Sequence, residues 1–363
     1  MLTDLNDASN ESEAAVLVAP FELTIATFNL FNYLVPPDAF YDFDRIYSAE
    51  QWQKKQTWIC TYLQEHAPDI IGFQEVFSSD NLAQLVKQAG YEHFAVVDQP
   101  TVIDDFIYRD PVVAIASRFP IKAAAAVSVD KELALQLGLT SEFNFSRKIV
   151  RATIDLPHLG DCDCYVVHFK SKRAAWQGEV DALTSAEGNA LNQFKAQIAG
   201  GWASSVQRGS EATLAMMSML ERRAKTGNAM MLMGDFNNPL QDGILAHLLT
   251  DKLAFNNDST QQRLVQFYRL RDAWDLYQNH VHAKQDEAMF TPMPRPPTHY
   301  YGQSSSVLDY ILLSSEFDAT AQSNYFEVFD YINTDKHLIN PLFDIDGEST
   351  DHAVVSVKLL LRE

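Results

Sequence analysis

Polar side chains suited to acid–base chemistry or metal binding stand repeatedly where an apolar, β-branched run of the sequence ends. Glu75, His168 and Asp235 each stand at the end of such a run. A lone polar residue in this place is usually a turn residue or a cap, and Glu75 by itself could cap a following helix. As a set, these residues predict ligands and acid–base groups that converge on one end of stacked sheets. In chain order the set comprises Asn29, Glu75, His168, Asp235, Asn237, Asp309, Asp351 and His352.

Asp309 is the hardest member of the set to explain as a turn residue, because it lies inside the apolar run 307–312. A buried carboxylate is costly unless it has a partner, so the sequence predicts a partner for Asp309. His352 opens the final apolar run, directly after Asp351. An imidazole changes its charge near neutral pH, which makes His352 a candidate for proton transfer.

The elements that must position these residues alternate along the whole chain. β-branched and apolar runs predict strands at 23–28, 69–73, 112–116, 148–155, 164–169, 229–233, 307–313 and 353–360. Apolar residues at helical spacing predict helices at 51–66, 81–87 and 205–225. In the last of these helices we expect Val206, Leu214, Met217 and Leu220 to face a core. Layered sheets with helices on the outside are the simplest arrangement.

Residues 21–363 contain no repeat and no long linker, so we expect one domain, preceded by an acidic tail at 1–20 that we expect to be frayed. Three segments resist assignment to the core: 35–49, 173–202 and 279–301. The segment 173–202 is helical in composition but is interrupted by glycines at 188, 200 and 201. Long surface segments often carry selectivity, although they can equally be inert.

The chain is strongly acidic, with 28 Lys+Arg against 48 Asp+Glu and a formal charge of −20 at pH 7. This charge repels nucleic acid and anionic membranes at long range, although a metal and a few local cations can reverse the field inside a cleft. The three cysteines favour a reducing compartment and no disulfide framework. Without a signal-like start we expect a cytoplasmic protein with no stable membrane association, and we infer no protein partner.

Several sequence blocks resemble the signature blocks of the endonuclease/exonuclease/phosphatase superfamily, which is also called deoxyribonuclease-I-like. In family order the blocks are Thr27-Phe28-Asn29-Leu30, Gly72-Phe73-Gln74-Glu75-Val76, the Ser117-Arg118 block at 113–120, Val167-His168-Phe169-Lys170-Ser171, Gly234-Asp235-Phe236-Asn237, Leu308-Asp309-Tyr310-Ile311-Leu312 and Ser349-Thr350-Asp351-His352. The resemblance runs from about Phe21 to Leu361. It implies an α/β (α+β) fold, a four-layer sandwich of two mainly antiparallel sheets flanked by helices. It also implies hydrolysis of phosphodiesters or phosphomonoesters with Mg²⁺ or Mn²⁺.

The resemblance further implies roles for the set. Asn29, Glu75 and Asp351 are expected to bind the metal through hard oxygen ligands. His168, Asp235, Asn237, Asp309 and His352 are expected to be catalytic. We expect Asp309 to fix the tautomer of His352, and Asp235 with Asn237 to position the attacking water, although His352 is an alternative base. Arg147 and Lys170 are expected to bind the substrate as part of a basic rim, unless that cluster is ordinary surface.

The substrate class remains open at this stage, between nucleic acid and a small or lipid-like phosphoester. The charge of −20 and the lack of a basic stripe favour the smaller substrate. In abasic-site repair enzymes of the superfamily an aspartate stands two places after the equivalent of Asn29; here that place is Phe31, which disfavours such a role. A catalytically silent binding or scaffold protein, and a zinc protein that uses Cys162 and Cys164, are the alternatives from other classes. Arg295 in its proline-rich loop is a further candidate to reach the substrate.

Overall fold

A computed structural model of the chain describes residues 20–176, 185–253, 259–284, 291–302, 304–339 and 349–362. The predicted tail at 1–20 therefore falls, apart from Pro20, outside the described residues. No helix in these ranges is long and apolar enough to cross a membrane.

Two six-stranded sheets form the centre of the described structure. The first sheet has the strand order β16 (Phe326–Thr334), β17 (Val354–Leu361), β1 (Glu22–Tyr33), β3 (Ile70–Val76), β7 (Val112–Ser117) and β4 (His93–Val96). The second has the order β12 (Arg271–Asp272), β15 (Asp309–Leu313), β11 (Ala229–Asp235), β10 (Gly160–His168), β9 (Val150–Leu156) and β8 (Ile121–Ala126). Only β1–β3 and β10–β11 pair in parallel within these sheets, so both sheets are mainly antiparallel, as the resemblance implied.

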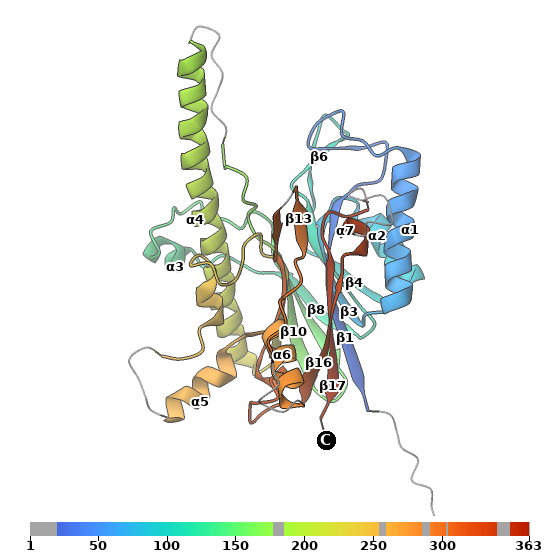
Figure 1. The fold of residues 1–363 in the computed structure, drawn as a ribbon, viewed down its shortest axis with the longest axis vertical. Coiled ribbons are helices and arrows are strands. Elements are labelled where there is room, and N and C mark those ends of the chain that lie inside the picture. The colour runs from blue at the N-terminus through green and yellow to red at the C-terminus, as the bar shows by residue number, and fades with distance from the viewer. Residues whose placement is uncertain are drawn as a thin grey trace, which may run out of the picture.

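The helices and the short strands surround these sheets (Figure 1). The helices are α1 (Ala49–His66), α2 (Ser79–Gln88), α3 (Lys131–Gln136), α4 (Ala186–Thr226), α5 (Ser259–Tyr268), α6 (Ala273–Ala283) and α7 (Lys336–Ile339), with 3-10 turns η1 (Ala246–Leu249) and η3 (Ser315–Phe317). A three-stranded sheet joins β2 (Ala39–Phe40), β6 (Ile107–Arg109) and β5 (Thr101–Ile103), and a hairpin joins β13 (His299–Tyr301) to β14 (Ser304–Ser306).

Three apolar clusters account for the four layers. One cluster fills the space between the sheets, with Ile25 and Ile115 from the first sheet packed against Val166 and Met231 from the second. A second cluster joins the outer face of the first sheet to α1 and α2, and a third joins the outer face of the second sheet to α4. The central strands thus bury both faces, which explains the continuous apolar runs of the sequence, whereas the edge strand β8 has no buried residue. The expected four-layer sandwich is confirmed.

Helix α4 differs from the sequence prediction, which placed a helix at 205–225 and breaks at the glycines before it. The helix instead runs without interruption through Gly200, from the Ser185 N-cap to Gly227, which takes φ 72°. Gly200 is needed for packing, because a Cβ at this position would lie 2.9 Å from the carbonyl oxygen of Trp176. Glycine costs roughly 1 kcal/mol in a helix, and the close approach of the segment 173–176 offsets this cost.

The predicted core face of this helix is also partly wrong. Leu214 is buried, but Val206 is 39% exposed and Met217 is 41% exposed. These two side chains therefore lie on a face of α4 that the described part of the chain does not cover.

Candidate active site

Strand register places three of the predicted residues in one row across the second sheet. β10 and β11 pair in parallel with His168 opposite Asp235, and β11 and β15 pair antiparallel with Asp235 opposite Asp309. Gly234, directly before Asp235, takes φ 147°, and a Cβ there would lie 1.9 Å from the carbonyl oxygen of Val167. Only glycine allows the backbones of β10 and β11 to lie this close together, and this contact lets β11 keep its register up to Asp235.

The first sheet brings Asn29 and Glu75 to the same end of the sandwich. β1 and β3 pair in parallel with Asn29 opposite Gln74, so Glu75 lies one residue further along. The prediction that Asn29 follows its strand is wrong: β1 continues to Tyr33, through a pairing irregularity after Asn29. Glu75 takes φ 60°, and such backbone at a non-glycine residue costs about 1–3 kcal/mol. The backbone N–H of Asn32 donates to Oε2 of Glu75 at 2.9 Å and holds the carboxylate in place.

Asp235 lies at the centre of the polar contacts between the two sheets. Its Oδ2 accepts from Nδ2 of Asn29 at 3.2 Å and from Nδ2 of Asn237 at 3.1 Å. The backbone N–H of Asn237 also donates to Oδ1 of Asp235 at 2.8 Å. Nε2 of His168 lies 3.4 Å from Oδ2 of Asp235 and 4.0 Å from Oε1 of Glu75. Residues from β1, β3, β10 and β11 therefore meet around one buried carboxylate.

His352 and Asp309 form a second buried pair beside Asp235. Nδ1 of His352 lies 2.8 Å from Oδ2 of Asp309, and Nε2 of His352 lies 4.0 Å from Oδ2 of Asp235. Oγ1 of Thr350 accepts from the backbone N–H of His352 and donates to the carbonyl oxygen of Asn29, so the loop before β17 is tied to β1. Oγ1 of Thr298 accepts from the N–H of Asp309 at 3.1 Å. The partner that the sequence required for the buried Asp309 is therefore His352.

The electrostatics of the site follow from burial and from its crowded carboxylates. Burial raises the pKa of Asp235 to about 7, although the neighbouring His352 acts in the opposite direction. Burial lowers the pKa of His168 well below its ordinary value, so this ring is neutral at pH 7. Burial alone would lower the pKa of His352 as well, but the Asp309 carboxylate reverses the effect and holds the pKa well above 6.5. The site thus combines one neutral imidazole with one imidazolium.

Asp351 and Glu75 line the same cavity, and their charges interact. Burial raises the pKa of Asp351, and the carboxylate of Glu75 raises it further against the opposing effect of His352. Oδ1 of Asp351 has no hydrogen-bond donor within the described part of the chain. Its nearest cationic neighbour by distance is Nε2 of His352, at 3.9 Å. These two carboxylates therefore leave a concentration of negative charge that a cation can balance.

A cavity of about 710 Å³ opens above this group. It is lined by Glu75, His168, Asp235, Asn237, Asp351 and His352, by the cations Arg45, Arg147, Lys172 and Arg173, and by apolar or aromatic residues that include Phe31, Phe40, Tyr41, Tyr301 and Leu308. Arg147 reaches the cavity as expected from the sequence. Lys170 is absent from the lining; its backbone N–H is bonded to Glu211, and Lys172 and Arg173 supply the rim instead.

Two other sequence hypotheses do not describe the structure. Arg295 does not reach the cavity: its guanidinium is ion-paired with the buried Asp272 and lies over the ring of Tyr310, with the centroid at 4.5 Å. Cys162 and Cys164 are both buried in the core between the sheets, with their sulfur atoms 4.0 Å apart. The residues around the two thiols are apolar, and no histidine or carboxylate of the described residues lies near enough to bind a metal together with them.

Sequence reasoning missed two residues that shape the site, Thr298 and His299. Thr298 is fully buried and fixes the start of β15, and its carbonyl oxygen accepts from the N–H of Ala353. The ring of His299 packs against that of His352, with centroids 4.9 Å apart. Both lie where a proline-rich segment enters the short strand β13, and no periodic pattern in the sequence marks that junction.

Comparisons with known proteins agree with this architecture. No curated protein matches the sequence significantly. Among solved structures, the human Nocturnin catalytic domain with bound sulfate anion is similar with a TM-score of 0.54 and 14% identity, over 94% of each chain. Truncated TDP2 of Caenorhabditis elegans matches with a TM-score of 0.51 and 12% identity, covering 94% of this chain and 98% of that one. An endonuclease/exonuclease/phosphatase family protein of Bacteroides thetaiotaomicron matches with a TM-score of 0.50 and 16% identity, covering 95% and 96%.

At these identities the solved structures show a shared fold. The family itself is shown by the model of the endonuclease/exonuclease/phosphatase family, which matches residues 26–352. Nearly the whole chain is included in this match, from the strand that carries Asn29 to His352. The protein therefore belongs to the endonuclease/exonuclease/phosphatase family, and it is a hydrolase of phosphoester bonds.

Proposed function

We propose that the protein hydrolyses a small phosphoester in its cavity of about 710 Å³, with Mg²⁺ or Mn²⁺ as cofactor. The observation that carries the proposal is the convergence of Asp235, His352 and Glu75 at the base of a cavity whose rim holds Arg147, Lys172 and Arg173. Acids at the base suit a cation and a water molecule, and cations at the rim suit the anionic oxygens of the ester.

The donor set at the base fits a divalent cation. Glu75 and Asp351 supply carboxylate oxygens, the hard ligands that Mg²⁺ prefers, and Oδ1 of Asp351 has no hydrogen-bond donor in the described part of the chain. When bound, the cation supplies Lewis-acid stabilisation of charge on the phosphoryl group. The amide oxygen of Asn29 already accepts from the N–H of Phe31 at 3.0 Å, and its Nδ2 donates to Asp235. We therefore assign Asn29 the positioning of Asp235 in addition to the ligand role expected from the sequence.

Asp235 is the group that we assign to the attacking water. With a pKa near 7, its carboxylate can accept a proton at neutral pH, and Asn237 fixes its orientation through two hydrogen bonds. The water oxygen forms a bond to phosphorus, its proton moves to Asp235, and the bond from phosphorus to the leaving oxygen breaks. Solvent then protonates the leaving oxygen.

His352 and His168 are assigned to the phosphoryl oxygens. The Asp309 carboxylate keeps His352 protonated, so Nε2 donates a charge-assisted hydrogen bond. His168 is neutral, and its Nε2 faces Asp235 and Glu75, so its N–H lies on the side where the ester must sit. Preorganised donors of this kind stabilise the charge that develops as the new bond forms.

The lining of the cavity favours a small phosphoester with an organic group over a long nucleic acid. The aromatic side chains of Phe40, Tyr41 and Tyr301 line the same cavity as the rim cations. Extended nucleic acid needs many phosphate contacts, and each uses a lysine or arginine. The chain has only 28 such residues against 48 acids, and the cations at the rim suffice for one or two phosphates.

The test is turnover of bis-p-nitrophenyl phosphate, inositol phosphates, sphingomyelin, plasmid DNA and abasic DNA in Mg²⁺ or Mn²⁺, with and without chelator. Glu75→Gln is expected to remove metal-stimulated turnover, and Glu65→Gln, the same change on the exposed face of α1, is expected to leave it intact. Asp235→Asn is expected to lower kcat by orders of magnitude while substrate binding persists. Full turnover in chelator, or wild-type turnover by Glu75→Gln, contradicts the proposal, and DNA as the best substrate overturns its choice of a small ester.

A further inference from the structure

Helix α4 carries an exposed apolar stripe that the activity does not use. The stripe consists of Leu191, Phe194, Ile198, Trp202 and Val206, which are 51%, 64%, 60%, 69% and 39% exposed. Their spacing of three or four residues places them on one face of the helix. Figure 1 shows this half of α4 extending beyond the ends of both sheets. Exposed apolar patches of this size mark interaction surfaces.

The stripe points away from the domain. Gly200 and Ser204 lie on the opposite face of α4, where the segment 173–176 packs against them. Oγ of Ser204 donates to the carbonyl oxygen of Arg173 at 2.6 Å. Two residues along a helix correspond to a rotation of about 200°, so Trp202 faces outward between these two inward positions. No part of the chain that the structure describes therefore covers the stripe.

The charge of this segment is unlike that of the rest of the chain. Lys195 is the only charged residue between Gly188 and Gln207, in a protein with a formal charge of −20. Two strongly acidic molecules repel at long range, and this segment of the helix is a place where they can meet without opposing carboxylates.

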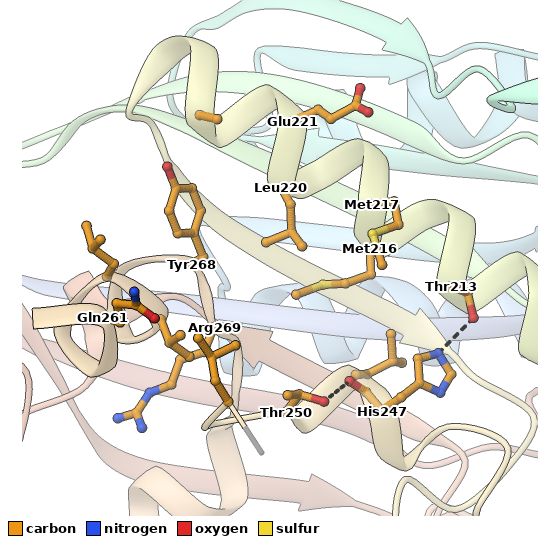
Figure 2. Close-up of a pocket in the computed structure, with 15 residues that line it drawn as sticks. Thr213, Met216, Met217, Leu220, Glu221, His247, Thr250, Gln261, Tyr268 and Arg269 are labelled. Atoms are coloured by element: carbon orange, nitrogen blue, oxygen red, sulfur yellow. Dashed lines mark hydrogen bonds between the residues drawn. The ribbon is translucent and has the colours of Figure 1, made fainter. Parts of the chain in front are cut away.

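The C-terminal half of α4 borders an apolar groove of about 810 Å³ on the same side of the helix. Figure 2 shows Met216 and Leu220 projecting from α4 into the groove, with Tyr268 of α5 and Thr250 after η1 across from them. The stripe continues into the groove at helical spacing, through Thr213 to Leu220. Protruding apolar residues and an apolar groove thus occupy the two ends of a single helix face.

We propose that a second copy of this chain covers this face, with the two α4 helices antiparallel. The stripe of each copy then lies in the groove of the other, in an isologous dimer with twofold symmetry. A single kind of partner accounts for both features. In each copy the stripe lies toward the N-terminus of α4 and the groove toward its C-terminus, so in an antiparallel pair each stripe lies opposite the groove of the other copy.

Charge complementarity gives the register of this pairing. Lys195 is the cation of the stripe, and Glu221 lines the groove, about 39 Å further along the helix at 1.5 Å per residue. When Lys195 of each copy lies opposite Glu221 of the other, the twofold axis passes close to Arg208. Arg269 also lines the groove, but its guanidinium is already paired with Asp318 at 2.8 Å.

The available area agrees with a stable dimer. The five stripe side chains expose on the order of 100 Å² each, which is roughly 500 Å² per copy. The groove wall adds further apolar area, and the total approaches the roughly 800 Å² per partner of a standard interface. A dimer that used the stripes alone would fall short of this value.

The experiment is sedimentation velocity of the full chain over a range of concentrations, together with circular dichroism to verify folding. The wild type is expected to be a dimer, and Phe194→Ser or Trp202→Ser is expected to raise the dimer dissociation constant by about 30-fold or more, the effect of losing an aromatic anchor. Val102→Ser removes an apolar side chain of similar exposure, 46%, on β5, and is the matched control that is expected to remain a dimer.

A charge exchange tests the register. Lys195→Glu and Glu221→Lys are each expected to weaken the dimer, and the double variant is expected to restore it. A wild type that is monomeric at every concentration overturns the proposal, as does a double variant no better than the single variants. Sedimentation of the monomer with phosphatidylcholine vesicles would assign the stripe to a lipid surface and also overturn it. These measurements do not depend on catalysis, so they stand apart from the proposed function.

Discussion

Replacement of Asp309 by asparagine tests the assignment of His352 as an imidazolium. Asp309 is 1% exposed, and its Oδ2 lies 2.8 Å from Nδ1 of His352. Asp309→Asn keeps the volume but removes the charge that most raises the pKa of His352, so burial, which lowers this pKa, is then opposed only by Asp235 and Asp351 and the pKa falls. A carboxylate-to-amide change beside a catalytic imidazole can cost on the order of 10⁴ in kcat. We expect a loss of about 10³–10⁴, which corresponds to about 4–5.5 kcal/mol.

The pH dependence gives the sign of the effect. In the wild type the pKa of His352 is held well above 6.5, so the ring stays protonated at neutral pH. In Asp309→Asn the protonated ring forms only at lower pH, and loss of the Asp309 charge also lowers the pKa of the base Asp235, so the pH of maximum turnover is expected to shift to a lower value than in the wild type. The assay is kcat and KM for bis-p-nitrophenyl phosphate with Mg²⁺ across this range, with thermal unfolding as the check on folding.

The matched control is Asp330→Asn, which makes the same change at a side chain that is 38% exposed and 4.0 Å from Lys358. It is expected to leave kcat unchanged. Turnover of Asp309→Asn close to that of the wild type, with the same pH profile, would refute the role assigned to the Asp309–His352 pair.

Two further predictions concern stability. Arg295→Ala leaves Asp272 buried without its ion-pair partner, so the free energy of unfolding in urea should fall by roughly 3–5 kcal/mol. Arg263→Ala, on the exposed face of α5, should change this free energy little. Equal values for the two variants would contradict the structural role of Arg295. Although burial acts to raise the pKa of Asp318, hydrogen bonds and nearby arginines lower it below its ordinary 3.8. Its contribution to stability is therefore present above that value and is lost as the pH falls toward the folded-state pKa. Asp318→Asn should cost roughly 1–3 kcal/mol at neutral pH and progressively less toward pH 3, and a loss that is independent of pH would contradict this assignment.

The family blocks and the strands that carry them could be predicted from the sequence. Continuous apolar runs such as 70–73 and 230–233 mark strands that are buried on both faces. The residues that follow them, Glu75 and Asp235, lie at strand ends because the chain must turn there. These signals depend on neighbouring residues in the sequence, so they can be recognised without knowing which elements pack against each strand.

The two basic residues predicted for the substrate show the limit of such signals. Arg147 lines the cavity, whereas Lys170 is absent from the lining, and Lys172 and Arg173 take its place. A short basic cluster cannot reveal which of its members faces a cavity, because that depends on how the segment after β10 packs on α4. Helix α4 also runs through Gly200, whose unfavourable propensity is offset by a close contact with the segment 173–176.

The sequence by itself determined the residue types of the site, their order and the layered class of fold, since these depend on composition and on short-range periodicity. Tertiary structure alone decided that Lys172 and Arg173 line the cavity in place of Lys170, that Arg295 belongs to a buried ion pair, and that no described part of the chain covers one face of α4. An apolar stripe of a helix has the same sequence pattern whether it is buried or exposed. What separates the two cases is the presence of a packing partner far away in the chain, or in another copy of it.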